Sequence, residues 1–132
     1  MDNKLKLYIV RHGQTEWNVL EKFQGQLNSP LTPEGIKKIE KTASELKNIK
    51  FEAVYTSELG RTISTAKIIL QNNNFEKIKN KNEKLTLYKL YELNEINFGE
   101  WQGMNFKEIF IKYPEEAHNY FCDVKNYTAK NI

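Results

Sequence analysis

The sequence has few residues of the kinds that cross-link a chain or break its regular structure. Its 132 residues include one cysteine, Cys122, with three prolines and six glycines. A single cysteine excludes an internal disulfide framework and suits a reducing compartment, so we expect a cytoplasmic protein. The apolar run at residues 5–10 is too short for a signal peptide or a membrane span. We therefore expect no membrane partner.

An excess of charge of one sign is also missing. The chain carries 20 basic and 17 acidic residues, a formal net charge of +3. That excess does not indicate a nucleic-acid partner, and the lysines are scattered without the aromatic platform that binds single strands. Apolar residues at 39% and charged residues at 28% are typical of a globular protein. The length allows one domain, which we expect to span residues 1–132.

Arginine and histidine are scarce, which makes their positions informative. Eighteen of the basic residues are lysines, and the two arginines are Arg11 and Arg61. The two histidines are His12, directly after Arg11, and His118. A planar guanidinium donates two parallel hydrogen bonds to a carboxylate or phosphate, which an ammonium does not. Chance codon use is the alternative, but these positions are the first candidates for a site.

Strand and helix patterns alternate along the chain. Runs rich in β-forming residues predict strands at 5–10, 51–56 and 85–88. Apolar residues at helical spacing follow the first two strands, at 36–49 and 59–70. The segment 13–31 is predicted to be a long, functional loop with room for one turn of helix, and the segment 71–84 to be a solvated loop. This order indicates an α/β fold with a largely parallel sheet.

The predicted helices have recognisable ends. Thr32 is a favourable N-cap before Pro33, and Ser57 is the expected cap of the second helix. Asn105 is the expected cap of a third helix that Pro114 ends. From Glu115 onward we find no clear periodicity.

Four residues are expected to meet at one edge of the sheet. In open α/β sheets, ligands bind beyond the carboxyl ends of the strands. Arg11 and His12 end the first predicted strand, Arg61 opens the helix after the second, and Glu95 follows the third. Arginines can neutralise a phosphoryl group, an imidazole can attack its phosphorus, and a carboxyl group can protonate the leaving oxygen. The acids, histidines and cysteine show no metal-ligand spacing, and we expect neither a metal nor a cofactor.

Four ordered motifs resemble one known family. The residues Arg11-His12-Gly13-Gln14-Thr15-Glu16-Trp17-Asn18 resemble the signature of the histidine phosphatase superfamily, the phosphoglycerate mutase-like family. Three later blocks are also similar to that family: 23–26 with 29–35, 55–66, and 93–103. The resemblance covers roughly residues 5–113. It implies a three-layer α/β/α fold with a largely parallel sheet, and a phosphomonoester hydrolase acting on a small phosphorylated metabolite.

The resemblance also implies a role for individual residues. His12 would be the nucleophile that becomes phosphorylated, and Glu95 would be the proton donor, with Glu92 and Glu100 as rivals. The phosphate pocket and its substrate side would be formed by Arg11, Asn18, Arg61, Gln24 and Gly25. Trp17 and Trp101 are expected to be packing residues.

Two departures from the family qualify these expectations. Family members have a second catalytic histidine, followed by glycine, at the end of a later strand. His118 is the one other histidine here, and neither an apolar strand nor a glycine flanks it. We therefore expect an incomplete domain that self-associates through an exposed sheet edge. An impaired protein that at most binds phosphate is the alternative function.

The residue after Glu95 bears on the reaction. Mutase-like members of the family have a basic residue there, whereas this chain has Ile96. The pattern around Trp101 is also more similar to that of the broad-specificity and α-ribazole phosphatases. Phosphatase activity is therefore favoured, and mutase-type phosphoryl transfer remains an alternative.

Overall fold

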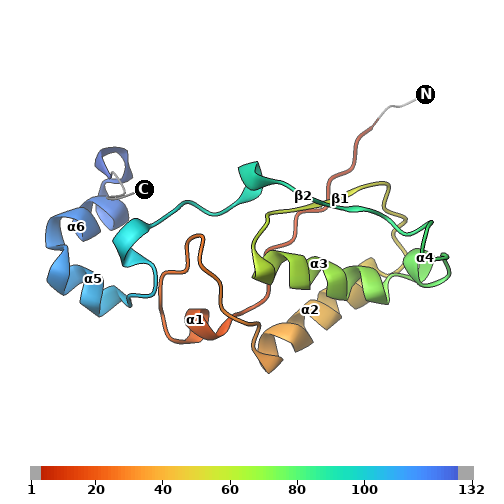
Figure 1. Cartoon of the computed structure of the whole chain (residues 1–132), viewed down its shortest axis with the longest axis horizontal. Helices are drawn as coiled ribbons and strands as arrows, with labels where there is room; N and C mark the ends of the chain where they lie inside the picture. Colours follow the sequence, from red (N-terminus) through yellow and green to blue (C-terminus); the bar gives the residue numbers. More distant parts are fainter. Residues whose placement is uncertain (1–3, 128–132) are drawn as a thin grey trace.

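The structure is a computed structural model that describes residues 4–127. Figure 1 shows two helical ends joined by loops, with α2, α3 and α4 at one end and α5 and α6 at the other. The helices are α1 (Glu16–Val19), α2 (Pro33–Leu46), α3 (Gly60–Asn72), α4 (Asn74–Lys77), α5 (Phe106–Lys112) and α6 (Pro114–Cys122). The strands are β1 (Val54–Thr56) and β2 (Leu87–Lys89), and the 3-10 helices are η1 (Tyr91–Leu93), η2 (Gly99–Trp101) and η3 (Val124–Asn126).

Helices α2 and α3 pack side by side and form the first hydrophobic cluster. The predicted start of α2 is confirmed, because the Thr32 side chain accepts a hydrogen bond from the Gly35 N–H at 2.9 Å and Pro33 occupies the first turn. The buried face of α2 carries Ile39 and Ala43, which pack with Ile69 of α3. The period of the apolar residues therefore specifies which face of each helix is buried.

The two described strands are parallel. Val54 lies opposite Leu87, and the Leu90 N–H just beyond β2 donates to the Thr56 carbonyl at 2.8 Å. Helices α2 and α3 lie on one side of this small sheet in Figure 1. The carboxyl ends of β1 and β2 therefore meet at one edge, from which α3 and the residue 91–98 segment lead away.

The strand predicted at residues 5–10 is not formed. Residues 4–14 have no regular secondary structure, and the side chains of Leu5 and Ile9 are 85% and 93% exposed. A strand exists only where a neighbour completes its hydrogen-bond ladder. In the described part of the chain, β1 pairs with β2 and neither pairs with this segment. The prediction was wrong because an apolar pattern alone supplies no partner.

Three helix predictions also need correction. Ser57 does not cap α3, because its hydroxyl pairs with that of Thr62 at 2.6 Å and Leu59 occupies the N-cap position. The short helix α4 lies inside the predicted loop 71–84. Helix α6 begins at Pro114, where we expected helix to end. Proline does end α5, but it also suits the first turn of a new helix.

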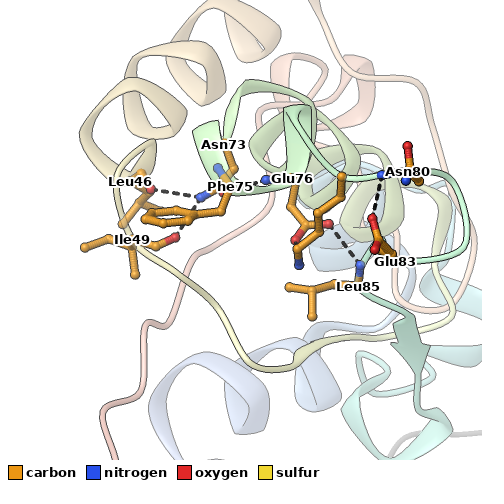
Figure 2. A network of polar contacts seen from close by, with 9 residues as sticks. Leu46, Ile49, Asn73, Phe75, Glu76, Asn80, Glu83 and Leu85 are labelled. Atoms are coloured by element: carbon orange, nitrogen blue, oxygen red, sulfur yellow. Dashed lines mark hydrogen bonds and ion pairs between the residues drawn. The ribbon is translucent and has the colours of Figure 1, made fainter.

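Asn73 joins the ends of three helices (Figure 2). Its amide donates to the carbonyl of Leu46, the last residue of α2, at 3.2 Å and to that of Ile49, just beyond α2, at 2.8 Å. Its side-chain oxygen accepts from the N–H groups of Phe75 and Glu76 and so caps α4. Since Asn73 is 1% exposed and directly follows α3, it fixes the connection from the α2–α3 pair toward β2.

A second cluster, which we call the aromatic cluster, forms the other end of the molecule. Its buried members are Phe23, Phe98, Trp101, Ile109 and Ala117. The ring of Phe23 lies edge-on to those of Phe98 and Trp101, with centroid separations of 4.9 and 5.6 Å. The cluster therefore joins the loop after α1 to η2, α5 and α6. Among the described residues, no helix has the length and apolar character needed to cross a membrane.

Candidate active site

His12 lies just after the irregular N-terminal segment and is half-buried. Its Nδ1 is 2.7 Å from the carbonyl oxygen of Gly13. The Gly13 N–H in turn donates to the Thr65 hydroxyl on α3 at 3.0 Å, and that hydroxyl donates to the Arg61 carbonyl at 2.7 Å. Helix α3 thus fixes the backbone beside the imidazole. Sequence reasoning assigned no such role to Thr65.

The hydrogen bond to Gly13 determines which ring nitrogen of His12 carries a proton. A carbonyl oxygen can only accept, so Nδ1 bears the hydrogen and a neutral ring leaves its lone pair on Nε2. Burial lowers the pKa of His12 below its usual value, and the charges of Arg61 and Arg11 lower it further. The Gly13 hydrogen bond and the charge of Glu95 act in the opposite direction. The net effect favours a neutral, nucleophilic imidazole.

Arg61 is buried at the start of α3 with 3% of its surface exposed. Its Nη2 donates to the Gly25 carbonyl at 2.8 Å and its Nη1 donates to the Leu27 carbonyl at 2.7 Å. Its Nε has no hydrogen-bond partner in the described part of the protein. Burial lowers the pKa of Arg61, and the charge of Glu95 raises it. Arg61 therefore holds the loop around residues 25–27 and contributes positive charge next to His12.

Gly25 is needed for this loop geometry. Its φ of +52° lies in the left-handed region. A Cβ at this position would lie 2.3 Å from Oε1 of Gln102 and 3.1 Å from the Ile96 carbonyl. The glycine thus lets the Arg61-bound loop approach the segment that carries Glu95.

Glu95 is exposed, and one of its carboxylate oxygens accepts from the Ile96 N–H at 2.9 Å. Its charge raises the pKa of both His12 and Arg61, and also that of Tyr120 in the aromatic cluster, so the carboxylate lies within electrostatic range of all three. Of its two sequence rivals, Glu100 accepts a hydrogen bond from the Tyr113 hydroxyl at the aromatic cluster. Neither Glu92 nor Glu100 is among the charges that shift the pKa of His12.

Asn18 and Gln24 have partners within the protein. The Asn18 Oδ1 accepts from the Thr15 N–H at 2.9 Å and hydroxyl at 3.0 Å, in the capping box of α1. This leaves its amide nitrogen as the group that could donate to a phosphate. Gln24 is 7% exposed, and its Oε1 accepts from the Ser29 hydroxyl at 3.0 Å. Gln24 therefore helps to shape the loop whose next residue, Gly25, accepts from Arg61.

Of the predicted site residues, Arg11, Arg61 and Glu95 lie within electrostatic range of His12, whereas His118 lies elsewhere. The charges of Arg11, Arg61 and Glu95 all act on His12, although Arg11 itself is exposed. His118 is exposed on α6, at the opposite end of the molecule from α2 and α3 in Figure 1. Among the residues described, no group of three or more acids, histidines or cysteines is placed to hold a metal ion.

Sequence reasoning missed the residues that support the Glu95 segment. Asn94 accepts from the Glu58 N–H at 2.8 Å, which anchors the segment beside the start of α3. The Gln26 side chain donates to the Glu95 carbonyl at 3.2 Å, and the Gln26 N–H donates to Gln102 at 2.8 Å. The family-like blocks contain all four residues, but nothing in their spacing predicts these pairings.

Comparison with known proteins agrees with the motifs and the fold. Phosphoserine phosphatase 1 of Hydrogenobacter thermophilus is 36% identical over 112 residues, which are 85% of this chain and 48% of the relative. A 2,3-bisphosphoglycerate-dependent phosphoglycerate mutase of Buchnera aphidicola is 38% identical over 115 residues, 86% of this chain and 47% of the relative. The chain spans about half the length of the curated relatives it matches.

A solved structure extends the likeness to three dimensions. The α-ribazole phosphatase of Shigella flexneri superposes with a TM-score of 0.78 at 27% identity, covering 92% of this chain and 55% of that one. The α/β, phosphoglycerate mutase-like fold is thereby confirmed. The family model described as histidine phosphatase superfamily (branch 1) matches residues 7–131. By sequence and by fold, this chain belongs to the histidine phosphatase superfamily.

Proposed function

We propose that His12 is the nucleophile of a phosphomonoester hydrolase that acts on a small phosphorylated metabolite through a phosphohistidine. The observation that carries this proposal is the hydrogen bond from Nδ1 to the Gly13 carbonyl, which leaves the Nε2 lone pair free. The lowered pKa of His12 keeps that nitrogen unprotonated near neutral pH. Arg11, Arg61 and Asn18 would bind the phosphate, with Gln24 and Gly25 at its substrate side.

In the first step, Nε2 of His12 attacks the phosphorus in line and the bond to the ester oxygen breaks. The Glu95 carboxyl group donates its proton to that oxygen, which leaves as an alcohol. The guanidinium charges of Arg61 and Arg11 stabilise the negative charge on the transferring group.

In the second step, the Glu95 carboxylate removes a proton from water, which attacks the phosphohistidine. The bond between phosphorus and Nε2 breaks, inorganic phosphate forms, and His12 returns to its starting state. Glu95 thus serves as acid and then as base, which its exposed position allows. No step requires a metal ion.

Ile96 favours hydrolysis over mutase-type transfer. The side chain after Glu95 is apolar and 51% exposed, so it offers no charge to bind the carboxylate of a phosphoglycerate. Similar proteins include a phosphoserine phosphatase and an α-ribazole phosphatase as well as phosphoglycerate mutases. Mutase-type transfer is the second candidate, and that mixture of relatives is what supports it.

Labelling tests the nucleophile. The chain is incubated with radiolabelled phosphoserine, quenched in base, and split between acid and base washes. We expect the protein to carry label that survives the base wash and is lost in the acid wash, because phosphohistidine is stable in base and labile in acid. The label should be absent from His12→Ala, because that variant lacks the nucleophile. His118→Ala is the matched control and keeps the label. Label that resists acid, or that persists in His12→Ala, contradicts the assignment.

A protein that binds phosphate without turnover is the alternative of a different class. It would bind vanadate in a manner that depends on His12 and Arg61 but would form no phosphoenzyme. We further propose that residues 1–132 form a single domain of a cytoplasmic protein that self-associates. The exposed Leu5, Leu7 and Ile9 support that association. A monomer in sedimentation equilibrium at micromolar concentration would contradict it.

A further inference from the structure

Glu95 sits in a segment that has little regular structure of its own. Residues 94–98 lie between η1 and η2 and form neither helix nor strand. The Glu95 side chain is exposed, and among the residues that the structure describes its carboxylate accepts one hydrogen bond, from the adjacent Ile96 N–H. The position of an acid that must meet a leaving oxygen therefore depends on what holds the backbone at residue 95.

Two contacts hold that backbone from outside the segment. Asn94 pairs with Glu58 at the start of α3, as described above. On the other side, the carboxamide of Gln26 donates to the Glu95 carbonyl at 3.2 Å. Gln26 belongs to the same loop whose Gly25 carbonyl accepts from Arg61. Glu95 and Arg61 are thus both hydrogen-bonded to the same short loop, residues 25–27.

Gln102 fixes Gln26. Its Oε1 accepts the Gln26 N–H at 2.8 Å and lies against Gly25, where a Cβ would come within 2.3 Å of it. Gln102 is itself held between the buried Trp101 and Gly103, whose N–H donates to the Phe23 carbonyl at 2.8 Å. The aromatic cluster therefore anchors a side chain that reaches into the active-site loop.

We propose that Gln102 is a positioning residue for the candidate acid: by accepting the Gln26 N–H, it holds Gln26 against the Glu95 carbonyl and so keeps the Glu95 carboxylate within electrostatic range of His12 and Arg61. The importance of this positioning for catalysis rests on the proposed function. Gln102 acts through Gln26 and has no contact with the reacting atoms.

The chemistry of the contact specifies the substitutions that test it. The contact needs an acceptor at the end of the residue 102 side chain, since its partner is an N–H group. Glutamate keeps an acceptor of the same reach, whereas methionine has similar length and volume but accepts only weakly. Gln102→Glu should therefore preserve the contact, and Gln102→Met should break it with little change in packing.

The two histidines allow the effect of Gln102 on the Glu95 carboxylate to be measured by NMR. In NMR titrations of the full chain, the ring proton of His12 reports the nearby carboxylate, because the charge of Glu95 raises the pKa of His12. His118 is exposed at the other end of the molecule and serves as the internal reference. Glu95→Gln should lower the pKa of His12. Gln102→Met should lower it as well, and the double variant should lower it no further than Glu95→Gln.

Three more variants complete the experiment. Gln26→Ala removes the contact with the Glu95 carbonyl while keeping the backbone N–H, so it should reproduce Gln102→Met even if the latter folds poorly. Gln102→Glu should keep the pKa of His12 at or above its original value. Gln71→Met, at an exposed position of α3, should change nothing.

Additive effects of Gln102→Met and Glu95→Gln, or no effect of Gln102→Met and Gln26→Ala in folded protein, would overturn the proposal. A chain that shows the coupled titration but forms no phosphohistidine supports the positioning role and refutes the proposed function. Failure of the positioning role and failure of the proposed function therefore give different experimental results.

Discussion

Replacing Arg61 with lysine tests the claim that one buried guanidinium holds the active-site loop. Arg61→Lys keeps the positive charge but replaces the two Nη donors, which have a fixed geometry, by a single ammonium group on a shorter side chain. The Gly25 and Leu27 carbonyls, now bound at 2.8 and 2.7 Å, cannot both keep their donors. The Gly25 carbonyl is buried, so losing its partner carries the larger cost.

The magnitude follows from those two bonds. A hydrogen bond to a charged group contributes about 1.5–3 kcal/mol, and an unsatisfied buried carbonyl costs about 1–3 kcal/mol. If the ammonium retains one bond, the free energy of unfolding should fall by about 2 kcal/mol. For a domain of this size, that corresponds to a decrease in Tm of roughly 8 °C.

Urea unfolding followed by tryptophan fluorescence measures this loss, because Trp17 and Trp101 lie on either side of the loop in the sequence. Lys67→Arg, at an exposed position of the same helix, is the matched control and should change stability by less than about 0.5 kcal/mol. Vanadate affinity should fall together with stability in Arg61→Lys only. Equal stabilities for the two variants would refute the reasoning, since the loop would then not depend on the guanidinium.

Two further predictions concern the network of Figure 2. Asn73→Ala removes a helix cap and the donors to two carbonyls, so urea unfolding should show a loss of about 2–4 kcal/mol, against less than about 0.5 kcal/mol for the exposed Asn74→Ala. Burial raises the pKa of Glu76, but hydrogen bonds from Lys79 and the Leu85 N–H and the charges of nearby lysines outweigh it, and the net pKa lies below the usual value of a glutamate. The carboxylate therefore stabilises the fold above its unfolded-state pKa, and this stability is lost as pH falls through the folded-state value. Glu76→Gln should lower stability at pH 7 and weaken the acid dependence of unfolding below about pH 5, and an unchanged pH profile would contradict this assignment.

Local chemistry made part of the fold predictable. The Thr32 cap with Pro33 and the Asn105 capping box depend on residues three or fewer positions apart, and both helices begin where the sequence indicates. The periodic apolar residues of α2 and α3 likewise define their buried faces. Two of the helix predictions failed because one residue type suits more than one local structure. Pro114 ends one helix and opens another, and Ser57 pairs with Thr62 instead of capping α3.

The candidate site was predictable to a similar extent. Residue types and their place after strands indicated that Arg61 and Glu95 would approach His12, and their charges do act on it. The sequence could not show that both Nη groups of Arg61 bind backbone carbonyls, or that Gln102 reaches Gln26, because these contacts join residues 34 to 76 positions apart. The strand at residues 5–10 failed for the same reason, since pairing depends on a partner elsewhere.

The two hydrophobic clusters have a consequence for the order of events during synthesis. The cluster of α2 and α3 is built from residues 31–69, so it can close as soon as that segment has left the ribosome. The loop around Gln26 must wait for Gln102, which is made 76 residues later. A nascent chain arrested between α4 and β2 should therefore carry a protected α2–α3 pair beside a loop that Arg61 already binds but that still lacks its contact with Gln102.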